Sequence, residues 1–169
     1  MRVLFVIGLL AITTLSATAA QLSINNRRAT AKALIAGSPK LRDGSFNASG
    51  VAGVCGVIPK EASITGEANF VLEFPSDDQS GTITSIAFGS KELVGGSTKS
   101  TVFRLSVGVV TANGGRPPLY VLNTDSNNPK NAGTAILTEV KGVTTLRVTG
   151  QEVMGETIDL TVVCSAAVP

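Results

Sequence analysis

The residues best suited to chemistry in this sequence are two cysteines and the carboxylates, because the chain contains no histidine. Without an imidazole it cannot build a Ser-His-Asp triad, a Cys-His pair or a histidine-ligated metal site. Two cysteines are too few for a four-thiolate zinc site or an iron–sulfur cluster. The remaining possibilities are disulfide or nucleophile chemistry at the cysteines, and acid–base or metal chemistry at the carboxylates.

Cys55 and Cys164 lie near opposite ends of the β-rich part of the chain. An even pair of cysteines in an exported protein predicts a disulfide. Two separate buried thiols, or a reactive nucleophile, are the alternatives. A nucleophile is disfavoured because neither cysteine has a cation nearby in the sequence to lower its thiol pKa. We therefore predict one bridge between an early strand and the last one.

The carboxylates do not form a pattern typical of catalysis or of calcium binding. Glu73, Asp77 and Asp78 are close in sequence, but they lack the alternating spacing of a calcium loop, which favours a solvated turn. Asp125 stands alone among asparagines and serine, a composition typical of Asx turns. We expect no catalytic residue, no metal site and no cofactor, although a hydrolase that uses carboxylates alone remains an alternative.

Residues 1–19 have the features of a secretory signal peptide. Arg2 gives a positive start, an apolar run follows from Val3 to Leu15, and Ala17 and Ala19 offer small residues at a cleavage site. The apolar run is shorter than the roughly twenty residues that a spanning helix needs. We therefore expect a secreted or periplasmic protein of about 150 residues with no membrane span, a length that suits one domain.

Residues 20–44 are rich in basic side chains, among them Arg27 and Arg28, and Asp43 is the single acid. One interpretation is electrostatic contact with an anionic envelope surface. The favoured interpretation is a solvated, mobile arm. Residues 29–36 could form a short helix within this arm. The formal charge of the whole chain is +2, and with so few aromatic residues we expect no nucleic-acid partner.

From residue 45 to 169 the hydrophobic pattern changes to a period of two, which indicates strands. The expected strands cover residues 51–57, 64–74, 82–88, 102–109, 119–123, 135–140, 143–149 and 157–164. Lys141 and Gly142 would form a two-residue hairpin turn. Short strands separated by turn signals predict an all-β domain, either an antiparallel sandwich or a partly closed barrel. Both cysteine side chains would then point into its core.

Three stretches of this body resemble the mycobacterial LpqH-type lipoprotein antigen family. They are GTITSIAFG at 81–89, residues 134–150 with TTLRVTG at their end, and TIDLTVVCS at 157–165. The resemblance covers roughly residues 45–165 and implies a β-sandwich with a Cys55–Cys164 disulfide. It also implies a surface or envelope protein, but no activity. The family is anchored through a lipidated cysteine, and no cysteine stands directly after the apolar run of this chain.

Three classes of function fit these observations. The first is a non-enzymatic exported binding or surface protein, whose loops 111–118 and 123–133 contact an unknown protein or envelope component. The second is a structural subunit of an envelope assembly, and the third is the carboxylate-only hydrolase. The candidate contact residues are Arg116, Tyr120, Asp125, Arg27 and Arg28. Tyr120 could equally belong to the core.

Overall fold

A computed structural model of the chain describes residues 25–37, 43–74, 80–94, 98–110, 119–125 and 131–167. The expected signal peptide, Arg116, Asp77 and Asp78 lie outside these ranges. The elements are β1 (Asn25–Ala36), β2 (Gly44–Ile58), η1 (Lys60–Ala62), β3 (Asn69–Phe74), β4 (Ser80–Gly81), β5 (Ile83–Ser90), β6 (Lys99–Ser100), β7 (Arg104–Val109), β8 (Leu119–Asn123), β9 (Ala132–Val140), β10 (Val143–Gln151) and β11 (Thr157–Ala167).

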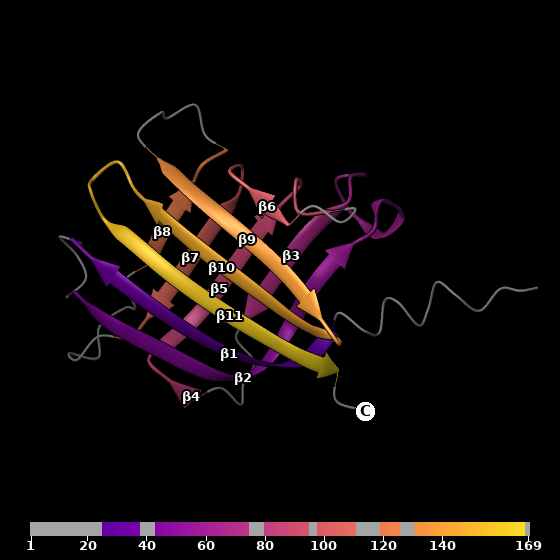
Figure 1. Cartoon of the computed structure of the whole chain (residues 1–169), viewed down its shortest axis with the longest axis horizontal. Coiled ribbons are helices and arrows are strands. Elements are labelled where there is room, and N and C mark those ends of the chain that lie inside the picture. Colours follow the sequence, from indigo (N-terminus) through magenta and orange to yellow (C-terminus); the bar gives the residue numbers. More distant parts are fainter. Residues whose placement is uncertain are drawn as a thin grey trace, which may run out of the picture.

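In the described part of the chain, eleven strands form one antiparallel sheet with the order β6-β9-β10-β11-β1-β2-β3-β5-β7-β8, and β4 pairs with β2. The sheet curls into a half-barrel, which confirms the predicted all-β, partly closed architecture. Figure 1 shows β9, β10, β11, β1 and β2 crossing in front of β3, β5, β7 and β8. We call these the front and back layers. The long strand β2 joins them, because it pairs with β1 on one side and β3 on the other.

The segment expected to form a short helix is strand β1. Its buried residues alternate with exposed ones: Ala29, Ala31, Ala33 and Ile35 face the core. Alanine favours helices locally, but β1 has a pairing partner on each side, and this tertiary pairing overrides the local preference.

The basic segment is therefore not an arm outside the fold. Its described part from Asn25 to Ala36 lies between β2 and β11, within the sheet. The predicted domain boundary near residue 45 is wrong for these residues, since they supply part of the core. Net basic charge suggested a solvated segment, but on β1 only the outward positions, such as Arg28 and Lys32, are exposed.

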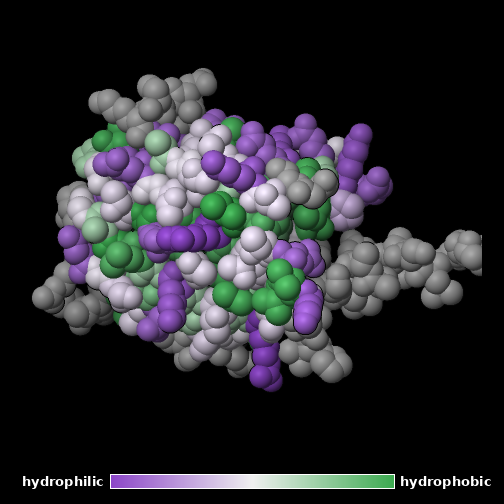
Figure 2. Space-filling model, in the orientation of Figure 1, coloured by the Kyte–Doolittle hydropathy of each residue, from purple (hydrophilic) through white to green (hydrophobic). Residues whose placement is uncertain are grey.

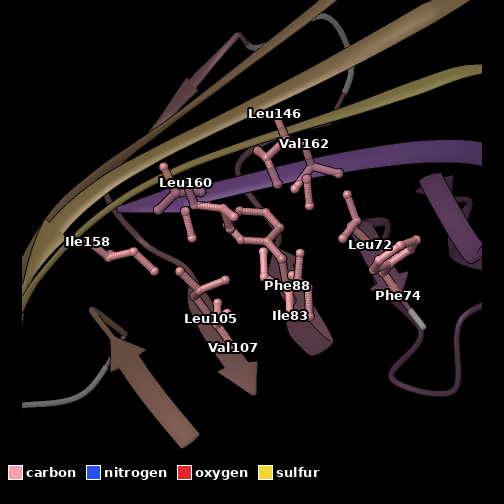
Figure 3. Close-up of a cluster of buried hydrophobic side chains, with 14 of the residues drawn as sticks. Leu72, Phe74, Ile83, Phe88, Leu105, Val107, Leu146, Ile158, Leu160 and Val162 are labelled. Carbon is pink, nitrogen blue, oxygen red and sulfur yellow. The ribbon is translucent and has the colours of Figure 1, made fainter. Parts of the chain in front are cut away.

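The core lies between the two layers and is built from the inward side chains of both. In Figure 3, Leu146, Leu160 and Val162 of the front layer point toward Phe88 and Leu105 of the back layer. The aromatic rings lie mostly on the back layer, where the Phe88 ring stacks on that of Phe103 at a centroid distance of 5.6 Å. The predicted alternation of strands 102–109, 143–149 and 157–164 is confirmed by these inward positions.

In two regions, residues with positive φ angles determine where a turn forms, once as predicted and once in place of a predicted strand. Lys141 and Gly142 both have positive φ angles, 51° and 77°, and form the predicted two-residue hairpin turn. The strand expected over 64–74 begins only at Asn69. Gly66 has a φ of 67°, which is incompatible with an extended strand, and the side chain of Ile64 is fully exposed.

The edge of the back layer closes onto the front layer through two glycines. A Cβ atom on Gly150 would lie 2.3 Å from Cδ2 of Leu122, and one on Gly133 would lie 2.8 Å from the ring of Phe103. The missing side chains therefore allow β8 to pack directly against β9 and β10. The hydroxyl of Tyr120, also on β8, donates a hydrogen bond to the backbone oxygen of Glu156 at 3.4 Å.

The predicted disulfide is present between Cys55 on β2 and Cys164 on β11, with both residues fully buried. Strand β1 lies between β2 and β11 in the sheet, so the bridge joins strands that are not direct neighbours. The two cysteines are 109 positions apart. In the chain-entropy model a loop near one hundred residues is worth about 4.7 kcal/mol of stability.

The described residues include no helix that is both long and apolar enough to cross a membrane.

Candidate functional site

A cavity of about 420 Å³ with both polar and apolar lining opens at one end of the back layer, and we call it the end pocket. It lies where β3 and β7 begin and where β5 and β8 end. Its polar lining comes from Thr65, Asn69, Ser90, Lys91, Arg104 and Asp125. Because neighbouring strands are antiparallel, the first residues of two strands and the last residues of the other two meet at this end of the sheet. The pocket therefore gathers side chains from five segments of the chain.

Two cations and their carboxylate partners surround the mouth of the end pocket. The Nη2 atom of Arg104 lies 3.2 Å from Oδ2 of Asp125, and Lys91 forms an ion pair with Glu67. The side chains of Arg104 and Lys91 are 72% and 64% exposed. Arg104 has five N–H donors, and in the described structure one of them is engaged. Donor capacity therefore remains toward a ligand.

Asn69 supplies an unused acceptor at the wall of this pocket. Its Oδ1 is, among the described residues, the one buried side-chain atom without a hydrogen-bond partner. A buried polar atom without a partner costs about 1–3 kcal/mol, and such atoms are rare in folded proteins. Asn69 itself is half-buried and lines the pocket.

A serine network holds the connection from β5 to β7 in place beneath the pocket. The buried Ser90 hydroxyl donates to the backbone oxygen of Val102 at 2.8 Å. The equally buried Ser100 lies on β6 and donates to Oε2 of Glu92 at 2.7 Å, while its Oγ accepts from the Val102 amide at 3.0 Å. These bonds fix the backbone next to Lys91 and Arg104. The pocket wall is therefore rigid on this side.

A second hollow of about 250 Å³ adjoins the end pocket on the outer face of the back layer, and we call it the outer groove. Two cross-strand rows build it. One row is Val71, Gly89, Arg104 and Asn123, and the next is Glu73, Ala87, Ser106 and Val121. Gly89, Ala87 and Ser106 are small residues in the middle of these rows, and they leave a depression between the side chains of β3 and β8.

Of the predicted contact residues that the structure describes, Asp125 alone lies in the end pocket. Tyr120 is fully buried and belongs to the core, the second of the two interpretations that its sequence position allowed. Burial, together with the nearby Glu152 and Glu156, raises its pKa well above the ordinary value. Arg28 is exposed on the outer face of β1, beside a separate hollow. Figure 2 shows the outer face of the front layer, where hydrophilic and hydrophobic side chains are interspersed.

Arg27 is not a surface contact residue, because only 5% of it is exposed. The described residues offer its guanidinium five acceptors: the backbone oxygens of Cys55, Gly142, Cys164 and Ser165 and the hydroxyl of Thr144. Burial lowers the pKa of Arg27, and Glu139 acts in the opposite direction. Every hydrogen-bonding partner is neutral, so Arg27 cross-links strands through dipoles. It is a structural residue.

The sequence pattern missed Arg104, Lys91 and Asn69 as site residues. Asn69 and Arg104 are the first residues of β3 and β7, and Lys91 directly follows β5, positions where a charged or polar residue is ordinary. Their common location depends on the strand order β3-β5-β7-β8, which single strands do not reveal.

The described residues contain no group of three or more histidine, cysteine or acidic side chains placed to hold a metal ion. Comparisons of the chain with family models, curated proteins and solved structures find no match. The resemblance to LpqH-type antigens accordingly stays a prediction.

Proposed function

We propose that this chain is an exported, non-enzymatic binding protein that holds a polar group of its partner in the end pocket. The observation that carries the proposal is the meeting of Arg104, Lys91, Asp125 and Asn69 at one cavity. The cavity offers cationic donors, a carboxylate and an amide oxygen without a partner. A few converging polar groups on a rigid scaffold are typical of binding sites.

Two further observations support this proposal. The Cys55–Cys164 disulfide fits an oxidising compartment outside the cytoplasm, in agreement with the predicted signal peptide. The pocket lies at strand ends and in adjoining turns, the usual location of binding residues on a β-scaffold. Export is tested by the mass of the protein recovered outside the cytoplasm. A mass that still includes residues 1–19 would contradict cleavage of a signal peptide.

Binding is tested by comparing two arginine variants in capture from an envelope extract. Arg104→Gln removes a pocket cation, and Arg147→Gln removes a matched one, since Arg147 also forms an exposed ion pair, with Asp159, but on the front layer. A partner held by wild type and by Arg147→Gln, but lost from Arg104→Gln, supports the proposal. Equal retention by both variants would exclude the end pocket as the binding site.

A structural subunit is the second candidate, because one observation favours it. Strand β8 is a terminal strand of the sheet, and in the described structure it pairs with β7 alone. It contains no charged residue, and Leu119 and Val121 are 55% and 43% exposed. An edge strand that carries no charged side chain can pair with a strand of another chain. Concentration-dependent oligomers that disappear in Val121→Lys would favour assembly, and a monomer at all concentrations would remove this candidate.

A further inference from the structure

The end pocket and the outer groove share two lining residues, Gly89 and Arg104. We propose that together they form one binding site for a small amphiphilic anion, whose charged head lies at Arg104 and Lys91 and whose apolar tail lies in the outer groove. This inference rests on the proposed function and adds a ligand class to it. Its structural basis is that Arg104 stands at the junction of the end pocket and the mainly apolar outer groove.

The hydrogen-bond donors of the end pocket suit an anionic head. Lys91 and Arg104 line the cavity, and each also forms an exposed ion pair at its mouth, with Glu67 and Asp125 respectively. Arg104 engages the Asp125 carboxylate through Nη2 at 3.2 Å, which leaves the other edge of its guanidinium for an incoming carboxylate or phosphate. The N–H groups of Arg104 and Lys91 are the donors that suit an oxygen anion.

The outer groove favours an uncharged tail. Its floor is formed by Ala87, Gly89 and Ser106, and Val71 and Val121 border it on β3 and β8. Glu73 stands beside Ala87 in the same cross-strand arrangement and would repel a second anionic group on the tail. A head with one anionic group and a short apolar chain therefore fits better than a polyanion.

A Cβ atom at Gly89 would make only an ordinary contact, at 3.6 Å from Nδ2 of Asn69. Position 89 therefore has room for a side chain, and its glycine does not adopt a positive φ angle. Ala87 is exposed and points outward. Ala87→Leu thus fills the groove without touching the core, which gives a variant that blocks the tail alone.

Octanoate and octyl phosphate, both below their micelle concentrations, are the probes that distinguish a carboxylate from a phosphate head. Octanol lacks the charge and acetate lacks the tail. We expect one or both octyl anions to bind by calorimetry, octanol and acetate to bind at least tenfold more weakly, and binding to weaken with added salt. Each methylene removed from the tail is expected to weaken binding by about twofold to fourfold.

Arg104→Gln is expected to weaken the octyl anions about tenfold or more, because a charged hydrogen bond is lost. Ala87→Leu should weaken octyl anions as well, whereas Arg147→Gln and Thr149→Leu, at exposed front-layer positions, should leave binding unchanged. Equal binding of octanol and octanoate, or no binding of either anion, would overturn this inference. Envelope partner capture that still depends on Arg104 would then leave the proposed function standing.

Discussion

The guanidinium group of Arg27 donates a 3.0 Å hydrogen bond to the backbone oxygen of Cys164, one half of the disulfide. It donates a second, also of 3.0 Å, to the backbone oxygen of Cys55, the other half. One buried cation on β1 thus bonds to both strands that the disulfide joins. Covalent and polar cross-links are therefore concentrated at one end of the half-barrel.

Arg27→Ala is expected to lower the free energy of unfolding by about 3 kcal/mol or more, because several buried backbone oxygens lose a charged donor. Urea unfolding measures the change. Arg28→Ala is the matched control on the exposed face of the same strand and should change stability by about 0.5 kcal/mol at most. Equal losses in the two variants would contradict the cross-linking role.

Removal of the disulfide through Cys55→Ala with Cys164→Ala is expected to cost a few kcal/mol, up to about 4.7 kcal/mol in the chain-entropy model. Guanidinium unfolding of the oxidised protein and of the double variant gives the difference. Because Arg27 bonds to both cysteine backbones, its substitution should not be additive with loss of the disulfide. Strict additivity would show that the two cross-links act independently.

Gly150→Ala is expected to destabilise the protein by about 1–3 kcal/mol, since the added Cβ would overlap Leu122 and the backbone oxygen of Ala132. Thermal unfolding provides the measurement. Gly53→Ala is the control, because there the nearest atom to an added Cβ is 3.9 Å away. Gly150→Ala should cost less stability in a Leu122→Ala background than in the wild type, because the smaller side chain leaves room for the added Cβ. An equal cost in both backgrounds would place the strain in the backbone contact alone.

Lys141→Asn is expected to stabilise the protein by about 0.5 kcal/mol, because asparagine tolerates the positive φ of this hairpin position better than lysine. Gly142→Ala should instead destabilise it by about 1 kcal/mol or more, since φ is 77° there. Chemical denaturation of both variants tests this pair. A stabilising Gly142→Ala would contradict the assigned turn geometry.

Tyr120 should make the protein less stable at alkaline pH. Its folded-state pKa is raised, so the unfolded chain loses the phenolic proton first as pH rises through about 10. The unfolded state then binds fewer protons, and the free energy of unfolding falls with increasing pH. Tyr120→Phe should flatten this decline between pH 9 and 12 if ~10 is the unfolded pKa. A decline of the same steepness in Tyr120→Phe would assign it to other groups.

The parts of this structure that follow local pattern were predictable from sequence. Alternation placed β7, β8, β10 and β11 and turned both cysteines inward, and Lys141 with Gly142 marked a hairpin. These features depend on neighbouring residues, so the chain reveals them without an alignment. The even pair of cysteines, in a chain expected to be exported, predicted the one disulfide.

The structural features that could not be predicted from the sequence depend on which strands become neighbours. Alanines and arginines in the segment of β1 look like a helix or a solvated arm until β2 and β11 flank it. Arg27 and Arg28 are adjacent and chemically equal, yet the pleat buries one and exposes the other. Arg104 and Asp125 meet because β7 pairs with β8, a register that no single strand encodes. The end pocket could therefore not be predicted from the sequence.

The central position of β1 also determines when this chain can finish folding. Arg27 bonds to the backbone of Ser165, which lies 138 positions later in the sequence. During synthesis β1 therefore waits for almost the whole chain before its second neighbour is available, and pairing across such distances is slow. Strand β1 can therefore pair with both of its neighbours only after β11 has been synthesised, and the Cys55–Cys164 disulfide can form only once that strand is present.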